Sequence, residues 1–222
     1  ESVALGVGGA DYYNKAFVKL DKATVGGATT VKVFETMAKI KTYIDKGAAG
    51  RDWNLATAMV INGKAGMQFM GDWAKGEFTA AGKVPGKDFI CTDAPGTQNA
   101  FTFNIDSMAM FQQKSPAAVK AQADLAATIM SPAFQEVFNL NKGSIPARLD
   151  TPMGKFDDCA KKSSFDMNAA AKSNKLVPSF AHKMAMPSAT EGAMVDVISQ
   201  FMNSSMTPAQ AAERLAKASA VR

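Results

Sequence analysis

The stretch from Gly66 to Gly76 constrains the fold more than any other part of the sequence. Residues 65–70 form an apolar, alternating run typical of a short strand, Gly71 follows, and residues 72–81 have the pattern of a helix. A strand that passes through a glycine directly into a helix is typical of an open α/β sheet, where ligands bind at that edge. Trp73 stands at the mouth of this helix. It either packs as a core aromatic or offers a flat apolar face to a sugar ring, and this stretch alone leaves both open.

The composition limits the classes of function. The chain has 222 residues, 47% of them hydrophobic, and a formal charge of +5 that is spread without a run of five like charges. Without a basic stripe we expect no nucleic-acid partner. No apolar stretch approaches the roughly 20 residues that a membrane span needs. The opening residues lack the basic region of a signal peptide. One histidine and two cysteines do not supply the spacing of a zinc site, so we expect no metal and no other cofactor.

Helical periodicity predicts helices over residues 11–21, 30–45, 52–61 and 188–202. Three more are expected after Ser115-Pro116, Ser131-Pro132 and Thr207-Pro208, because the hydroxyl caps free N–H groups and proline suits the first helical position. Strands are expected at 65–70 and 101–111, residues 83–100 alternate loop and short strand, and a loop-rich stretch follows residue 146. The fold class is therefore α/β, with strands so few and short that the sheets look incomplete.

Several of these pieces, in order, resemble the second half of an extracellular solute-binding protein of an ABC transporter, from the large family that binds sugars. Within it, the sequence is most similar to periplasmic glucose/mannose-binding proteins. The resemblance covers essentially the whole chain. It is carried by Gly66–Trp73, Asp93–Thr97, the Ser115-Pro116 helix, Phe134-Gln135, Asn141–Pro146 and the helix after Thr207.

The resemblance implies a two-lobed, periplasmic-binding-protein-like fold with a sugar in the cleft between the lobes. Residues 1–100 and 146–222 would form the second lobe, and residues 101–145 would cross into the first lobe and return. The rest of the first lobe, the missing N-terminal half, would be this chain's partner. It would cover apolar residues that the crossing piece otherwise exposes, such as Phe134, Val137 and Phe138. The resemblance also implies a periplasmic location and delivery of the sugar to a membrane permease.

Five residues are candidate sugar ligands by this resemblance. Trp73 would stack on the C–H face of the sugar, the Lys142 ammonium beside Gly143 would donate to several hydroxyls, and His182, the one histidine, lies in a loop that would reach the cleft. Asn104 would donate to one hydroxyl and accept from another, and Asp106 is its rival as a paired acceptor. Strand alternation would put Asn104 and Asp106 on one face. Core packing, strand-end capping and solvated surface charge are the competing structural interpretations.

The leading functional hypothesis is capture of a monosaccharide, glucose or mannose, by closure of the lobes about hinges near residues 100 and 145, without chemistry. The alternatives are a glycoside-acting enzyme, which would need a carboxylate pair such as Asp72 and Asp106, and a chemoreceptor ligand-binding protein. An exported protein also makes a disulfide between Cys91 and Cys159 reasonable, with two unpaired thiols as the alternative.

Overall fold

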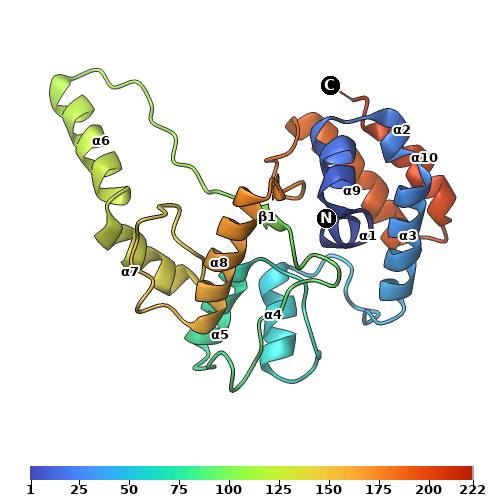
Figure 1. The fold of residues 1–222 in the computed structure, drawn as a ribbon, viewed down its shortest axis with the longest axis horizontal. Coiled ribbons are helices and arrows are strands. Elements are labelled where there is room, and N and C mark those ends of the chain that lie inside the picture. Colours follow the sequence, from blue (N-terminus) through green and yellow to red (C-terminus); the bar gives the residue numbers. More distant parts are fainter. Residues whose placement is uncertain (222) are drawn as a thin grey trace. The chain divides into compact units, whose positions relative to one another are not determined.

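The computed structural model describes residues 1–221, which form many helices and a small parallel sheet, compatible with part of an α/β fold (Figure 1). The chain divides into two compact units, which are described separately below. The first unit comprises Glu1–Arg51, Thr92–Asn104 and Asp166–Arg222, and the second comprises Asp52–Cys91 and Ile105–Phe165. The assignment of residues 1–100 and 146–222 to one lobe concerns a two-lobed protein and stays a prediction.

Helices from both ends of the chain build the first unit. In Figure 1 the blue helices near the N-terminus lie beside the orange and red helices of the C-terminal part. The elements are α1 (Ser2–Tyr13), a π-helical turn (Asn14–Val18), α2 (Lys22–Val25), α3 (Ala28–Lys41), β1 (Phe101–Phe103), β2 (Leu176–Pro178), α9 (Ser188–Met202) and α10 (Pro208–Ala218). The C-terminal helix α10 packs against α3 and α9, and α1 packs against α3.

The core of the first unit is aromatic and aliphatic. Tyr13, Phe34 and Met194 are among its largest fully buried side chains. The Phe34 ring meets that of Phe201 on α9 edge-on, with 4.8 Å between centroids. Burial of such side chains contributes about 1.5–3 kcal/mol each, so this core holds together segments that are far apart in the sequence.

The sheet of the first unit is a parallel pair. Phe101, Thr102 and Phe103 of β1 stand opposite Leu176, Val177 and Pro178 of β2. The Ser179 N–H donates to the Phe103 carbonyl at 2.9 Å, and the chain then turns away. The predicted strand over 101–111 is therefore wrong beyond Phe103, because β2 supplies no partner past that point.

The second unit is built from shorter elements. They are α4 (Trp53–Ile61), a 3₁₀ turn (Asp72–Ala74), α5 (Lys75–Ala80), α6 (Pro116–Ile129), α7 (Pro132–Lys142) and the first part of α8 (Asp158–Lys172). Helix α5 packs against α4 and α7. At the contact with α7, a Cβ atom on Gly76 would lie 2.8 Å from the Lys142 carbonyl oxygen, so a larger residue would push the two helices apart.

Residues 65–70, predicted to be a strand, have no strand pairing within the described part of the chain. The side chain of Gln68 is instead bonded to α4: its Nε2 donates to the Trp53 carbonyl at 3.0 Å, and its Oε1 accepts from the Thr57 hydroxyl at 2.8 Å. Met67 and Phe69 are exposed. The prediction of this strand is wrong because apolar alternation describes a strand's faces but does not supply a neighbour for its backbone groups.

The helix predictions are confirmed where the sequence contains a cap. Ser115, Ser131 and Thr207 each accept a bond from an N–H of the first turn, as expected. Helix α3 ends at Lys41, earlier than predicted. Helix α8 was not predicted, because its sequence is polar; Asp157 caps it by accepting from the Ala160 N–H at 2.8 Å.

A disulfide joins Cys91 to Cys159 within the second unit, with Cα atoms 5.7 Å apart. It connects the loop after Phe89 to the first turn of α8, and thus fixes the start of that helix. No helix among residues 1–221 is both long and apolar enough to span a bilayer.

Candidate functional site

Trp73 lies in the 3₁₀ turn that begins α5 in the second unit. Its indole ring folds back over Gly71: a Cβ atom added to Gly71 would lie 2.1 Å from the ring, so a larger residue there would displace the indole. The side chain is half-buried. Trp73 is thus neither deep in a core nor loose on the surface, which suits a stacking platform.

The turn that carries Trp73 is tied down on its polar side. The Asp72 carboxylate accepts the Ile145 N–H at 3.2 Å, which links the turn to the loop after α7. Burial raises the pKa of the Asp72 carboxyl above its usual range, and the nearby charges of Lys75 and Lys142 offset part of this rise. One turn later, Lys75 is only 6% exposed and binds both oxygens of Asp157, at 2.6 and 2.7 Å.

Lys142 and Asp106, predicted separately, form an ion pair in the second unit. Lys142 is the last residue of α7, which Gly143 ends in the left-handed conformation at φ 88°. The Lys142 Nζ also lies 5.7 Å from the centroid of the Phe138 ring. Because Gly76 on α5 touches the Lys142 carbonyl, the elements that carry Trp73 and Lys142 are in direct contact. The structure therefore brings Trp73, Lys142 and Asp106 into one region.

The strand that was expected to place Asn104 and Asp106 on one face does not extend to these residues. Strand β1 ends at Phe103, before either residue, so strand alternation does not relate them. Asn104 is the last residue of the segment Thr92–Asn104 of the first unit, and Asp106 belongs to the second unit. The two carboxylates considered for an enzyme also have other partners: Asp72 accepts from Ile145 and Asp106 pairs with Lys142.

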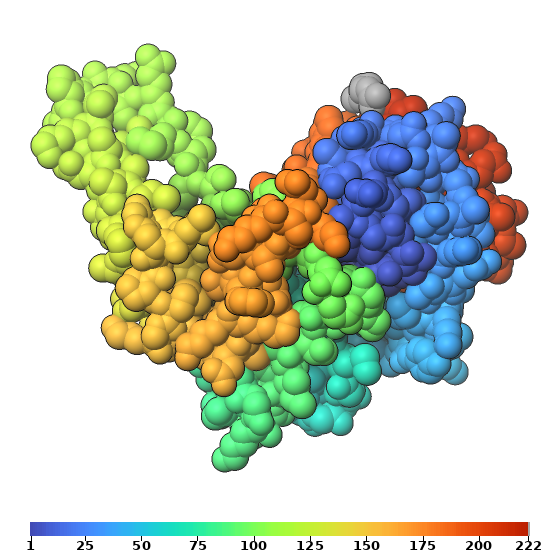
Figure 2. Space-filling model, in the orientation of Figure 1, coloured from blue at the N-terminus to red at the C-terminus, as the bar shows by residue number. Residues whose placement is uncertain are grey.

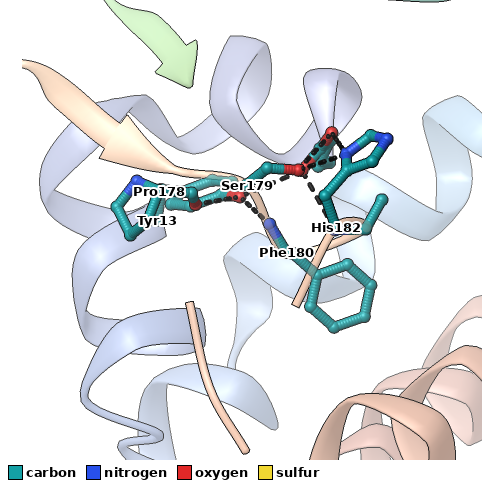
Figure 3. A network of polar contacts seen from close by, with 7 residues as sticks. Tyr13, Pro178, Ser179, Phe180 and His182 are labelled. Carbon is teal, nitrogen blue, oxygen red and sulfur yellow. Dashed lines mark hydrogen bonds and ion pairs between the residues drawn. The ribbon is translucent and has the colours of Figure 1, made fainter. Parts of the chain in front are cut away.

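His182 and Asn104 both follow the carboxyl ends of the parallel pair in the first unit, since β1 ends at Phe103 and β2 at Pro178. Carboxyl ends of parallel strands are where open α/β sheets bind ligands. The His182 Nδ1 lies 2.8 Å from the Ser179 hydroxyl and 4.0 Å from Glu1 Oε1 (Figure 3). Its side chain is 35% exposed.

The loop that carries His182 is held by Tyr13 and Glu1 (Figure 3). The buried Tyr13 hydroxyl donates to the Pro178 carbonyl at 3.0 Å and accepts from the Phe180 N–H at 2.9 Å. The Glu1 carboxylate accepts from the Ser179 hydroxyl at 2.8 Å and from the Ala181 N–H at 3.2 Å. Burial, and next the charge of Glu1, raise the pKa of Tyr13 far above its usual range, so the phenol stays protonated.

Sequence reasoning missed these supporting residues. Contacts between distant segments, which leave no local signal in a single sequence, involve Glu1, Ser179, Lys75 and Asp157. Asp72 did have a local signal, because it stands next to Trp73 in the stretch that begins the helix.

The outer face of α7 is apolar and open. Val137 is 60% and Phe138 40% exposed, and with Phe134, Asn141 and Lys142 they line a shallow hollow of about 510 Å³. In the space-filling view the yellow-green atoms of α6 and α7 lie at the surface (Figure 2).

Comparison with known proteins confirms the predicted resemblance, because the relatives found are named as sugar-binding periplasmic proteins and as an ABC transporter extracellular-binding protein. No family model matches it. It is 50% identical over 210 residues to a probable sugar-binding periplasmic protein of Brucella suis, covering 95% of this chain and 50% of that protein. A protein of the same description from Rhizobium meliloti is 47% identical over 218 residues, which are 98% of this chain and 52% of that protein.

A more distant relative is an uncharacterized ABC transporter extracellular-binding protein of Pyrococcus horikoshii. It is 34% identical over 205 residues, which are 92% of this chain and 44% of that protein. The chain is thus similar over nearly its whole length to these binding proteins, and it spans about half the length of the curated relatives it matches.

Proposed function

We propose that this chain is part of the sugar-binding component of an ABC transporter, which captures a monosaccharide in the periplasm and delivers it to a membrane permease. The observation that carries the proposal is the identity of 45–50% to proteins named as sugar-binding, over nearly the whole chain. The half-buried indole of Trp73, seated on Gly71, supports it, because a fixed aromatic face suits the apolar side of a pyranose ring.

Each proposed ligand residue has a distinct role in this account. Trp73 stacks on the ring, Lys142 donates to hydroxyls and Asp106 accepts from them; in the absence of sugar the two charged groups pair with each other. Asn104 and His182 are proposed as hydroxyl partners at the carboxyl ends of β1 and β2. The preferred sugar is proposed to be glucose, with mannose second.

The open face of α7 also has a role in the proposed function. We propose that the first lobe of the two-lobed protein covers Val137 and Phe138, whose exposure would otherwise be costly in water. The lobes would close over the sugar about hinges near residues 100 and 145, and the closed form would be presented to the permease.

A hydrolase is the main alternative, and the polar network of the first unit argues against it. Glu1, Ser179 and His182 are the residue types of a catalytic triad, but in the triad the carboxylate and the serine bind opposite nitrogens of the imidazole. Here Ser179 binds Nδ1 and Glu1 at once, so the ring is not placed to take the serine proton through Nε2 toward a substrate. A chemoreceptor role would use the same binding step.

Titration calorimetry of the protein carrying both lobes tests the proposal, with glucose, mannose, galactose and maltose as ligands. We expect saturable binding of glucose, weaker binding of mannose, and recovery of every sugar unchanged. Absence of binding to all four sugars, in protein that melts cooperatively, would contradict the proposal. Release of glucose from maltose or an aryl glucoside would favour the enzyme instead.

A further inference from the structure

One arrangement of hydrogens satisfies the described contacts of Ser179 with Glu1 and His182. The Glu1 carboxylate can only accept, and both its oxygens lie within reach of the Ser179 hydroxyl, at 3.0 and 2.8 Å. Ser179 is buried and has a single hydrogen to donate. A bond to a carboxylate is stronger than one to a neutral ring nitrogen, so that hydrogen points to Glu1.

This arrangement determines the protonation of the histidine ring. The Ser179 Oγ presents only its lone pairs to His182 Nδ1, which lies 2.8 Å away. A contact of that length between two acceptors would be repulsive, so Nδ1 must carry the hydrogen and donate it. In a neutral imidazole the other nitrogen, Nε2, is then the acceptor.

We propose that Glu1 and Ser179 are positioning residues that hold His182 in the Nδ1–H tautomer, so that its Nε2 accepts a hydrogen bond from a ligand hydroxyl. The tautomer is inferred from the contacts of Ser179 with Glu1 and His182, while the identity of the hydroxyl as a sugar group rests on the proposed function. A neutral acceptor at this position would favour ligands that present a hydroxyl as donor and disfavour those with an ether or carboxylate oxygen there.

Nitrogen-15 NMR of the histidine-labelled two-lobed protein at about pH 8 reads the tautomer without any sugar. We expect His182 Nδ1 to resonate as a protonated, pyrrole-like nitrogen and Nε2 as an unprotonated, pyridine-like one. His182→Gln identifies the signals. In Glu1→Ala the Ser179 hydrogen becomes available to Nδ1, so the pattern should reverse; in Ser179→Ala it should move to the mixture of a free imidazole.

Ser219→Ala is the matched control. Ser219 is also buried in the first unit and its hydroxyl donates to the Ala216 carbonyl at 2.9 Å, so its loss should leave the imidazole signals unchanged. Thermal melts of each variant establish that the protein is folded. A wild-type ring protonated at Nε2, or signals unaltered by both Glu1→Ala and Ser179→Ala, would overturn the proposal.

Sugar titrations separate this proposal from the proposed function. Loss of one acceptor should weaken binding by about fivefold in folded Glu1→Ala and Ser179→Ala, and hardly at all in Ser219→Ala. The expected tautomer in a wild type that binds no sugar would support the network and contradict the proposed function. Normal sugar affinity in both variants, despite a changed tautomer, would contradict the acceptor role of Nε2.

Discussion

The phenol of Tyr13 offers a sharp test of how the first unit holds the loop that carries His182. Its ring is fully buried and packs edge-on against Phe17, with centroids 5.0 Å apart. Tyr13→Phe keeps this packing and removes only the hydroxyl. The Phe180 N–H then loses its acceptor at 2.9 Å and the Pro178 carbonyl loses a donor at 3.0 Å.

The magnitude follows from the burial of the groups left behind. A buried polar group without its partner costs about 1–3 kcal/mol, and the Phe180 N–H belongs to a buried residue. We expect Tyr13→Phe to lower the free energy of unfolding by about 2 kcal/mol. Tyr12→Phe is the matched control: the Tyr12 hydroxyl bonds Thr30 at 2.7 Å, but Thr30 keeps the Thr24 carbonyl as a partner, so the loss should be about 1 kcal/mol or less.

Urea unfolding of the two-lobed protein, followed by far-UV circular dichroism, measures both variants. A lower midpoint at an unchanged slope reports a change in stability alone. A Tyr13→Phe variant no more destabilised than Tyr12→Phe would contradict this expectation. Equal effects would mean that water or a local shift satisfies Phe180 and Pro178.

Three further predictions concern the second unit. Burial raises the pKa of the Asp72 carboxyl, so its protonation stabilises the fold below the usual carboxyl pKa, and this stability is lost as pH rises through the folded pKa. Urea midpoints should therefore show Asp72→Asn becoming more stable relative to the wild type as pH rises above the usual carboxyl pKa, and a difference that is constant with pH would contradict the assignment. Unfolded, unreduced protein should give no free thiol from Cys91 or Cys159, and reduction should cost roughly 4 kcal/mol for a sequence separation of 68 residues, whereas two titratable thiols would exclude the bond. The isolated chain should bind a hydrophobic dye in part through Val137 and Phe138, so Val137→Ser with Phe138→Ser should lower that signal; equal dye binding by this double variant would argue against the face.

Local rules in the sequence predicted the helix starts. The hydroxyl-proline pairs act within one turn, so Ser115, Ser131 and Thr207 cap helices wherever these lie in the fold. Strands depend on a partner elsewhere in the chain. The apolar pattern of 65–70 and 101–111 therefore predicted more strand than the structure contains, because β2 provides a partner only for Phe101–Phe103.

The candidate site shows the same division. The Gly71–Trp73 stretch was recognisable because a glycine, a tryptophan and a helix start stand together, and Gly71 lies under the indole. The pairing of Lys142 with Asp106 and the support of His182 by Glu1 join residues far apart in the sequence. Contacts of this kind arise from packing, and no local sequence pattern predicts them.

We propose that Trp73 supplies much of the sugar affinity of this lobe, and the sharpest test is calorimetric titration of glucose into the two-lobed protein carrying Trp73→Ala. Apolar contact with the ring should be worth about 1–3 kcal/mol, so the dissociation constant should rise roughly ten- to hundredfold, with Trp73→Phe retaining part of the affinity. Trp53→Ala is the matched control, because Trp53 is 42% exposed on α4 and has no proposed role in binding. We expect Trp73→Ala to weaken binding while the melting temperature without sugar stays nearly unchanged. A lowered melting temperature with unchanged affinity per folded molecule would show instead that Trp73 is a structural residue and not a sugar ligand.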